Sequence, residues 1–193
     1  MKRQLALGAL AIACYALHGA DRVWHQDPWD LLWACHVSCL LVGLGAIFRS
    51  PVLVAAGVLW LSFGVPMWLL DLATGGDFLP TSTLTHVGGL AAGIPILARS
   101  GWPRGAWWRA ALLLMALMLL TRLVAPPPGN VNLAFRVWTG WEQRFPSYGP
   151  YFVLLLTCAT VTFVFVEYVL VAGVGRLSSR IARHPRSGVS STS

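Results

Sequence analysis

Six apolar stretches, separated by short polar connections, occupy almost the whole of this 193-residue chain. A helix needs roughly 20 apolar residues to cross a bilayer, and a chain with several such stretches has few other ways to fold. Only 11% of the residues are charged, whereas soluble domains carry about 25%. The sequence therefore predicts an all-α polytopic membrane protein with six transmembrane helices, at roughly 5–20, 30–48, 52–72, 83–98, 106–124 and 149–174.

The basic residues predict how these helices are oriented. If the N-terminus lies in the cytoplasm, ten of the fourteen Lys and Arg residues fall on the cytoplasmic side, as the positive-inside rule requires. Both termini are then cytoplasmic, and we expect a multi-pass protein of the bacterial cytoplasmic (inner) membrane. These loop residues also explain the net charge of +7, so no nucleic-acid partner is predicted. Residues 1–175 form the predicted transmembrane domain, and the polar residues 176–193 a disordered basic cytoplasmic tail.

Two of the predicted helices share a pattern with a period of fifty residues. Residues 36–43 read HVSCLLVG and are followed by Arg49-Ser50, while residues 86–93 read HVGGLAAG and are followed by Arg99-Ser100. A His within an apolar span is costly and usually functional. The repeat places His36 and His86 on helices of the same direction, in the outer leaflet, and predicts that they share one site. In the alternative interpretation each His only hydrogen-bonds a neighbouring helix and fixes its packing.

Further candidates lie on the faces that carry the two His residues. Cys39 follows His36 by about one helical turn, and a neighbouring His can activate a thiol nucleophile. Thr85 precedes His86 in the run of hydroxyl residues 81–85, which offers other nucleophiles. Within that run, Ser82 or Thr83 is also expected to cap the fourth helix.

Two charged residues close predicted helices at the outer side. Asp71 ends the third span and would orient a His, as a carboxylate does in a hydrolytic triad. Arg122 ends the fifth and would hold a lipid phosphate through bidentate hydrogen bonds. An ion pair between them is a further expectation. The alternative is that headgroups and water solvate both.

The long outer loop 125–148 completes the predicted site. Apolar residues recur there at steps of three and four, which predicts a short helix in the membrane interface. Asn132 and Arg136 lie in this segment, where they would cover the two His residues and bind substrate.

The order of these features resembles a known family. YwaF-type bacterial integral membrane proteins and the related transmembrane protein 164 family, ether-phospholipid acyltransferases, are six-span bundles with a His-x-Cys element in the second span. They also carry a His in the fourth span and an Asn in the last outer loop. The matching residues here are His36 with Cys39, then His86, then Asn130 or Asn132, although the spacing is His-x-x-Cys. A more distant similarity is to androgen-induced-gene type membrane hydrolases, which use a Thr and a His.

These observations predict an outer-leaflet polar pocket and leave open whether the chain is an enzyme. The first hypothesis is lipid ester hydrolysis or acyl transfer, with His as general base and Cys39 or a hydroxyl as nucleophile. The second is a non-catalytic lipid-binding or membrane-complex assembly protein, and the third is bis-His haem ligation. Membrane lipids are the expected partners. Motifs for metal, nucleotide or covalent haem binding are absent from the sequence, so no cofactor or metal is predicted.

Overall fold

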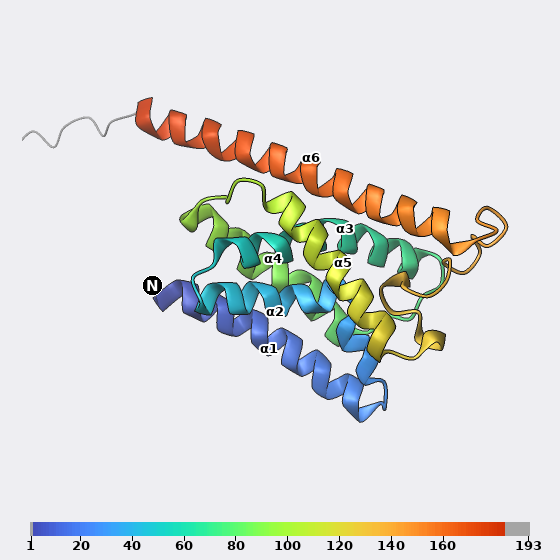
Figure 1. Ribbon diagram of the computed structural model, residues 1–193. Coiled ribbons are helices and arrows are strands. Elements are labelled where there is room, and N and C mark those ends of the chain that lie inside the picture. The colour runs from blue at the N-terminus through green and yellow to red at the C-terminus, as the bar shows by residue number, and fades with distance from the viewer. Residues whose placement is uncertain (1, 184–193) are drawn as a thin grey trace, which may run out of the picture.

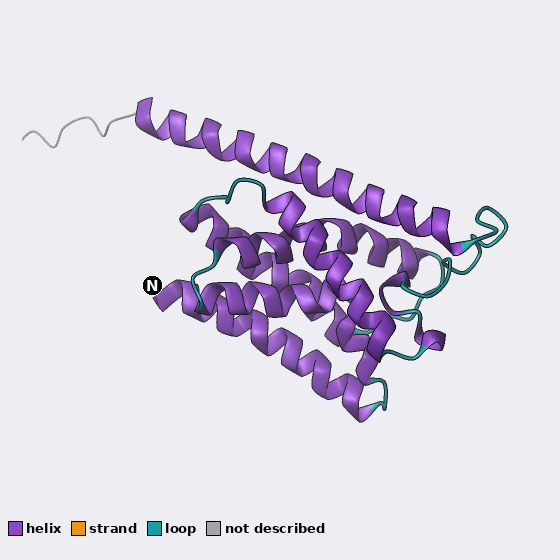
Figure 2. Cartoon of the chain, viewed as in Figure 1, coloured by secondary structure: helices purple, strands orange, loops and turns teal. Residues whose placement is uncertain are grey.

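The computed structural model describes residues 2–183, with side chains described for residues 2–171, and these residues are all-helical (Figures 1 and 2). The helices are α1 (Lys2–Trp24), α2 (Ala34–Ile47), α3 (Pro51–Ala73), α4 (Pro80–Ser100), α5 (Ala106–Val124) and α6 (Tyr148–Arg183). Three short 3-10 helices join them: η1 (Pro28–Leu32), η2 (Pro127–Gly129) and η3 (Val131–Leu133). No strand occurs among the described residues, so the predicted all-α class is confirmed.

Three helices are long and apolar enough to cross a membrane. They are α3, α5 and the portion Tyr148–Val171 of α6, and α2 is an apolar helix of shorter length. Helices α1 and α4 do not meet that combination of length and hydropathy. A membrane protein is therefore supported, while six spans with a defined orientation stay a prediction.

Prolines and polar caps determine where the central helices begin. Pro51 and Pro80 occupy the first positions of α3 and α4, where a missing N–H costs least. Ser50 caps α3 by accepting a hydrogen bond from the Leu53 amide. The carboxylate of Glu167, from the apolar part of α6, accepts hydrogen bonds from the amides of Gly105 and Trp107 at the start of α5. An acidic side chain deep in α6 is thus paired with a helix N-terminus, which favours negative charge.

Helix α2 lies at the centre of the bundle because it packs against α1, α3 and α4. Small residues allow the close approach: a Cβ added at Gly43 would lie 3.0 Å from the Gly8 carbonyl oxygen of α1. Helix α5 packs against α3 and α6, and α6 lies across the side of the bundle opposite α1 (Figure 1). Close contacts between α2 and α4 bring the two copies of the repeated pattern side by side.

The N-terminus and the far end of α6 lie at one end of the bundle, and the outer loop and η1 lie at the other (Figure 1). Helix α6 continues through Arg183, past the predicted end of the transmembrane domain at residue 175. The rest of the predicted tail, residues 184–193, lies outside the described residues.

The predicted interfacial helix in the outer loop is wrong. Only η2 and η3 form there, and Asn130, Asn132 and Leu133 all have positive φ values, which break a helix. The side-chain oxygen of Asn130 instead accepts hydrogen bonds from the amides of Phe135 and Arg136. An Asn side chain that satisfies nearby amides in this way competes with helix formation.

Candidate functional site

The rings of the two repeated His residues meet at the outer-loop end of the bundle. The centroids of His36 and His86 lie 5.7 Å apart and the rings are nearly perpendicular. A third ring, that of His18 on α1, lies 4.0 Å from His36. All three side chains are buried. The predicted convergence of His36 and His86 is therefore confirmed, and His18 joins them.

The hydrogen bonds of His36 define its tautomer. Its Nδ1 lies 2.8 Å from the backbone carbonyl oxygen of Asp30, which can only accept, so Nδ1 carries the proton. The lone pair is then on Nε2, which lies 3.1 Å from the Ser82 Oγ of α4. The Ser82 hydroxyl therefore donates to His36, in the arrangement in which an imidazole can take up a hydroxyl proton.

His86 is held in the same way but has no second partner. Its Nδ1 donates to the backbone carbonyl of Ser82 at 2.8 Å, one turn earlier in α4. Its ring stacks on Trp68 of α3, with centroids 4.5 Å apart. Its Nε2 is buried and has no hydrogen-bond partner. Since Nδ1 carries the proton, this Nε2 presents an unused lone pair.

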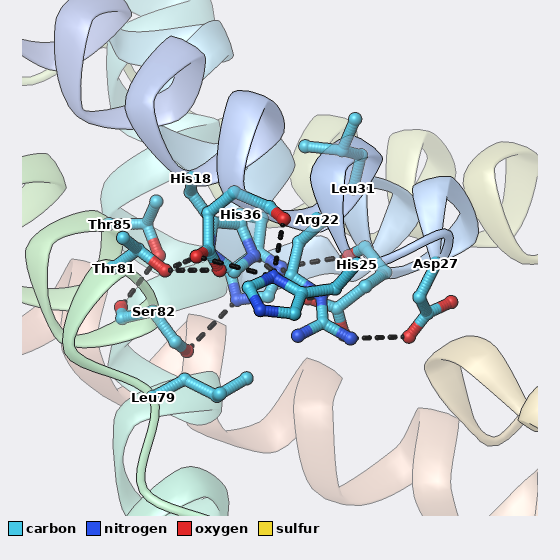
Figure 3. A network of polar contacts seen from close by, with 12 residues as sticks. His18, Arg22, His25, Asp27, Leu31, His36, Leu79, Thr81, Ser82 and Thr85 are labelled. Carbon is cyan, nitrogen blue, oxygen red and sulfur yellow. Dashed lines mark hydrogen bonds and ion pairs between the residues drawn. The ribbon is translucent and has the colours of Figure 1, made fainter.

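A network of polar contacts that includes the Asp30 carboxylate lies next to His36, on the side of α1 (Figure 3). The Asp30 Oδ2 atom lies 2.8 Å from His18 Nε2, 3.5 Å from Arg22 Nε and 3.6 Å from His36 Nδ1. Thr81 of α4 contacts His18 Nδ1 at 3.0 Å and donates to Asp21. Burial alone would raise the pKa of Asp30, but the hydrogen bond from His18 and the electrostatic influence of the neighbouring His and Arg22 side chains outweigh it and hold that pKa below its ordinary value. Asp30 is therefore an ionised group beside His36.

A cavity of about 400 Å³ opens next to these groups, within the range of about 300–1,000 Å³ typical of ligand pockets. One wall is polar and includes Asp30, Cys35, His36, Ser82, His86 and Asn132. The lining residues from α3, α5 and α6 are apolar apart from Asp71, and include Phe63, Met67, Leu114, Met118, Leu155 and Ala159. The cavity is thus suited to a molecule with a polar reactive group and an apolar chain.

Two predicted catalytic residues lie in the helix contact behind the cavity and not on its wall. The Cys39 thiol is fully buried and donates to the backbone carbonyl of Thr85 at 3.0 Å. The Thr85 hydroxyl is also fully buried and donates to the Ser82 carbonyl at 2.7 Å. The Cys39 thiol thus joins α2 to α4, while the Thr85 hydroxyl bonds within α4, the helix that carries Ser82.

Asp71 and Arg122 do not form the expected ion pair. Asp71 lines the cavity, but the carboxylate beside His36 is that of Asp30. The Arg122 Nε donates to the Ala134 carbonyl, and its guanidinium lies over the Tyr148 ring at 4.7 Å. Arg122 is therefore engaged in holding the outer loop.

The two outer-loop residues also have structural partners. Asn132 accepts a hydrogen bond from the Ala34 amide at 2.7 Å and donates to the Leu32 carbonyl and the Thr121 hydroxyl. It thereby caps the start of α2 while lining the cavity. The Arg136 guanidinium donates to the Pro128 carbonyl at 3.1 Å and does not line the cavity. Asn132 thus lines the same cavity as His36 and His86, and Arg136 braces the loop.

Sequence reasoning gave no role to His18, Asp30 or Cys35. His18 could have been identified as a candidate site residue, because it is a further His inside an apolar stretch. Ser82 was expected either as a cap or as one of several hydroxyls. The cap prediction is wrong, because Pro80 begins α4 and Leu79 precedes it. Asp30 and Ser82 reach His36 from separate elements, which the spacing along the chain does not show.

Comparisons with family models, with curated proteins and with solved structures found no match to this chain. The resemblance drawn from the sequence pattern therefore stays a prediction, and the geometry of the site carries the functional argument.

Proposed function

We propose that this chain is a membrane enzyme of lipid ester chemistry, a hydrolase or acyltransferase, with Ser82 as nucleophile and His36 as general base. The observation that supports this best is the 3.1 Å contact between Ser82 Oγ and His36 Nε2 on the wall of the cavity. A nucleophile within hydrogen-bond reach of a base, with the base oriented by a third group, is the common arrangement for acyl transfer. The proposed nucleophile is Ser82 because Cys39 is bonded to Thr85 behind the cavity.

The proton transfers follow from the hydrogen bonds of His36. Ser82 Oγ attacks the ester carbonyl carbon as its proton moves to His36 Nε2, and Nε2 then returns that proton to the departing alcohol. Water in a hydrolase, or a second alcohol in a transferase, attacks the acyl-serine by the same route and releases Ser82. The Asp30 carbonyl fixes the orientation of the ring, and the Asp30 carboxylate, 3.6 Å from Nδ1, stabilises the imidazolium.

The two walls of the cavity favour a lipid substrate. The polar wall receives the ester, while the apolar wall on α3, α5 and α6 covers an acyl chain. These three helices are the ones that can span a bilayer, so the acyl chain would lie at membrane depth. With the cytoplasmic N-terminus that the basic residues predict, the site opens to the outer leaflet of the bacterial inner membrane.

The other hypotheses have less support from the geometry. Axial haem ligation needs room for a macrocycle between two imidazoles, whereas the buried rings of His36 and His86 lie edge to face with centroids only 5.7 Å apart. A purely lipid-binding cavity does not require the Ser82 hydroxyl to donate to a base. It remains the interpretation to adopt if Ser82 is unreactive.

The test is covalent labelling of the full chain in detergent or nanodiscs with a fluorophosphonate that carries a long alkyl chain. We expect mass spectrometry to find the adduct on Ser82 and Ser82→Ala to abolish it. Ser62→Ala is the matched control, since that hydroxyl donates within α3 to Leu59. Labelling that survives Ser82→Ala, or a wild-type chain that is not labelled, would contradict the enzyme proposal.

A further inference from the structure

The proposed reaction leaves one buried polar atom of the site unused. His86 is 1% exposed, and its Nε2 has no hydrogen-bond partner. A buried polar nitrogen without a partner is destabilising, because it has lost its hydrogen bond to water. Because His86 lines the cavity, a ligand bound there could supply the partner that this nitrogen lacks.

Two further residues offer donor atoms close to the His86 ring. The thiol of Cys35, an imidazole nitrogen of His36 and one of His86 all lie within 4.8 Å of one another. Cys35 is a free, half-buried cysteine, and all three residues line the cavity. A second cluster, His18 with Asp30 and His36, lies nearby. Both ring nitrogens of His18 already have protein partners there.

Both imidazoles are oriented as metal ligands usually are. A His that binds a metal donates its other N–H to a carbonyl or carboxylate, which fixes the tautomer. The Nδ1 atoms of His36 and His86 each donate to a backbone carbonyl at 2.8 Å. Both lone pairs are consequently on Nε2, and the Asp30 carboxylate lies behind His36 as a second-shell negative charge.

We propose that Cys35, His36 and His86 form a site for one Zn²⁺ ion, with a fourth ligand position open to the cavity. One thiolate and two imidazoles are ligands that Zn²⁺ prefers, and three protein ligands with an open position are typical of reactive zinc sites. Zinc requires Zn–N and Zn–S distances of about 2.0–2.3 Å, which small rotations of these three side chains would provide. The Cys35 thiol loses its proton to solvent on binding. This inference departs from the sequence prediction, which included no metal.

Zinc binding has a consequence for Ser82, and this consequence rests on the proposed function. The ion takes the lone pair of His36 Nε2 that otherwise accepts the Ser82 proton. Metal binding and activation of Ser82 therefore exclude each other, and zinc is expected to slow the labelling of Ser82. The two proposals can still fail separately, because zinc binding does not need the Ser82 hydroxyl.

The test uses the full chain, purified in detergent and stripped with a chelator, then loaded with Zn²⁺ or with Co²⁺ as a spectroscopic probe. We expect one Zn²⁺ per chain and, with Co²⁺, a thiolate-to-metal charge-transfer band together with tetrahedral ligand-field bands. Cys35→Ser should abolish the charge-transfer band, while Cys158→Ser, at an exposed position on α6, should leave it unchanged. Loss of the band in Cys158→Ser with its retention in Cys35→Ser would overturn the proposal.

His86→Gln should abolish stoichiometric zinc binding, whereas His25→Gln, at an exposed residue of the α1 end, should not. His86→Cys guards against a merely misfolded variant, because it supplies a second thiolate and should strengthen the charge-transfer band. Ser82→Ala should retain zinc. A stripped wild-type chain that binds no Zn²⁺, or zinc binding that is unaffected by both Cys35→Ser and His86→Gln, would contradict the metal site while leaving Ser82 labelling to be judged by itself.

Discussion

His36 and His86 occupy equivalent positions in a repeated helix pattern, yet their surroundings differ. Each donates from Nδ1 to a backbone carbonyl at 2.8 Å. Beyond that bond, His36 accepts from Ser82 and lies beside the Asp30 carboxylate, while His86 stacks on Trp68 with an unpartnered Nε2. The repeat thus provides two similarly held imidazoles, and the neighbouring elements give only one of them the contacts of a general base.

The starts of the two helices differ as well. Helix α2 is capped by Asn132, a residue of the outer loop nearly one hundred positions later in the chain. Helix α4 begins with Pro80 and has no side-chain cap. The start of the helix that carries His36 is therefore held by the outer loop, whereas the helix that carries His86 has no such side-chain cap.

The largest expected effect separates the two His residues by reactivity. His36→Gln should slow fluorophosphonate labelling of Ser82 by about 10²–10⁴-fold, the usual contribution of a general base. His86→Gln should slow it far less, because His86 does not contact the Ser82 hydroxyl. Labelling rates of both variants, with His25→Gln as control, provide the measurement. Equal losses of labelling rate in the two variants would contradict the proposed difference between His36 and His86.

The next effect concerns the cap of α2. Asn132→Ala leaves the Ala34 amide and the Leu32 carbonyl without their partner, which should lower the unfolding free energy by roughly 2–3 kcal/mol. Gln143→Ala, an exposed amide in the same loop, should have little effect. Thermal unfolding in detergent measures the loss, and hydrogen exchange should increase at the start of α2 but not of α4. Equal exchange at both helices would mean that the loop does not position His36.

A smaller effect compares the repeated glycines. A Cβ at Gly43 would meet Ile12 and the Gly8 carbonyl of α1, whereas a Cβ at Gly93 would meet only the side chains of Val58 and Val42. Both Ala substitutions should destabilise by about 1–3 kcal/mol, as overpacking does. Gly43→Ala should cost more, since a backbone oxygen cannot rotate away. Thermal unfolding measures both losses, and a larger loss for Gly93→Ala would contradict this order.

The smallest effect is on acid stability. Because the folded-state pKa of Asp30 lies below its ordinary value of 3.8, its ionised form contributes stability above about pH 4. That contribution is lost as the pH falls through the lowered pKa. Asp30→Asn should therefore reduce stability near neutral pH and flatten the acid limb of the stability curve. An unchanged loss of stability at low pH would mean that the ionised Asp30 carboxylate does not stabilise the structure around His36.

The approximate positions of the helices could be predicted because most of them contain long apolar stretches. The predicted span 106–124 coincides with α5, and 52–72 differs from α3 by one residue at each end. The second helix begins later than expected because Pro28 starts a separate 3-10 turn that carries Asp30. The prediction of an interfacial helix was wrong because Asn130 and Asn132 take positive φ values, which the apolar periodicity of the sequence does not reveal.

The site was predictable only where the sequence repeats itself. His36 and His86 share a pattern, and their convergence follows from two parallel helices in contact. Asp30 and Ser82 reach His36 through a turn and a helix register that only packing determines. Cys39 satisfied the spacing rule for a thiol near a His, but its Sγ donates to Thr85. Spacing identifies the face of a helix, and packing decides which side chains on that face line a cavity.

Backbone carbonyls hold both imidazoles through Nδ1, so that both Nε2 lone pairs are available at the cavity. Nitrogen NMR of the chain labelled with ¹⁵N-histidine tests this directly, because protonated and unprotonated ring nitrogens have distinct shifts. Assignment comes from His36→Gln and His86→Gln. We expect a protonated Nδ1 and an unprotonated Nε2 in both residues, with only the His36 Nε2 shifted by a hydrogen bond. A protonated Nε2 on either ring at neutral pH would contradict this expectation.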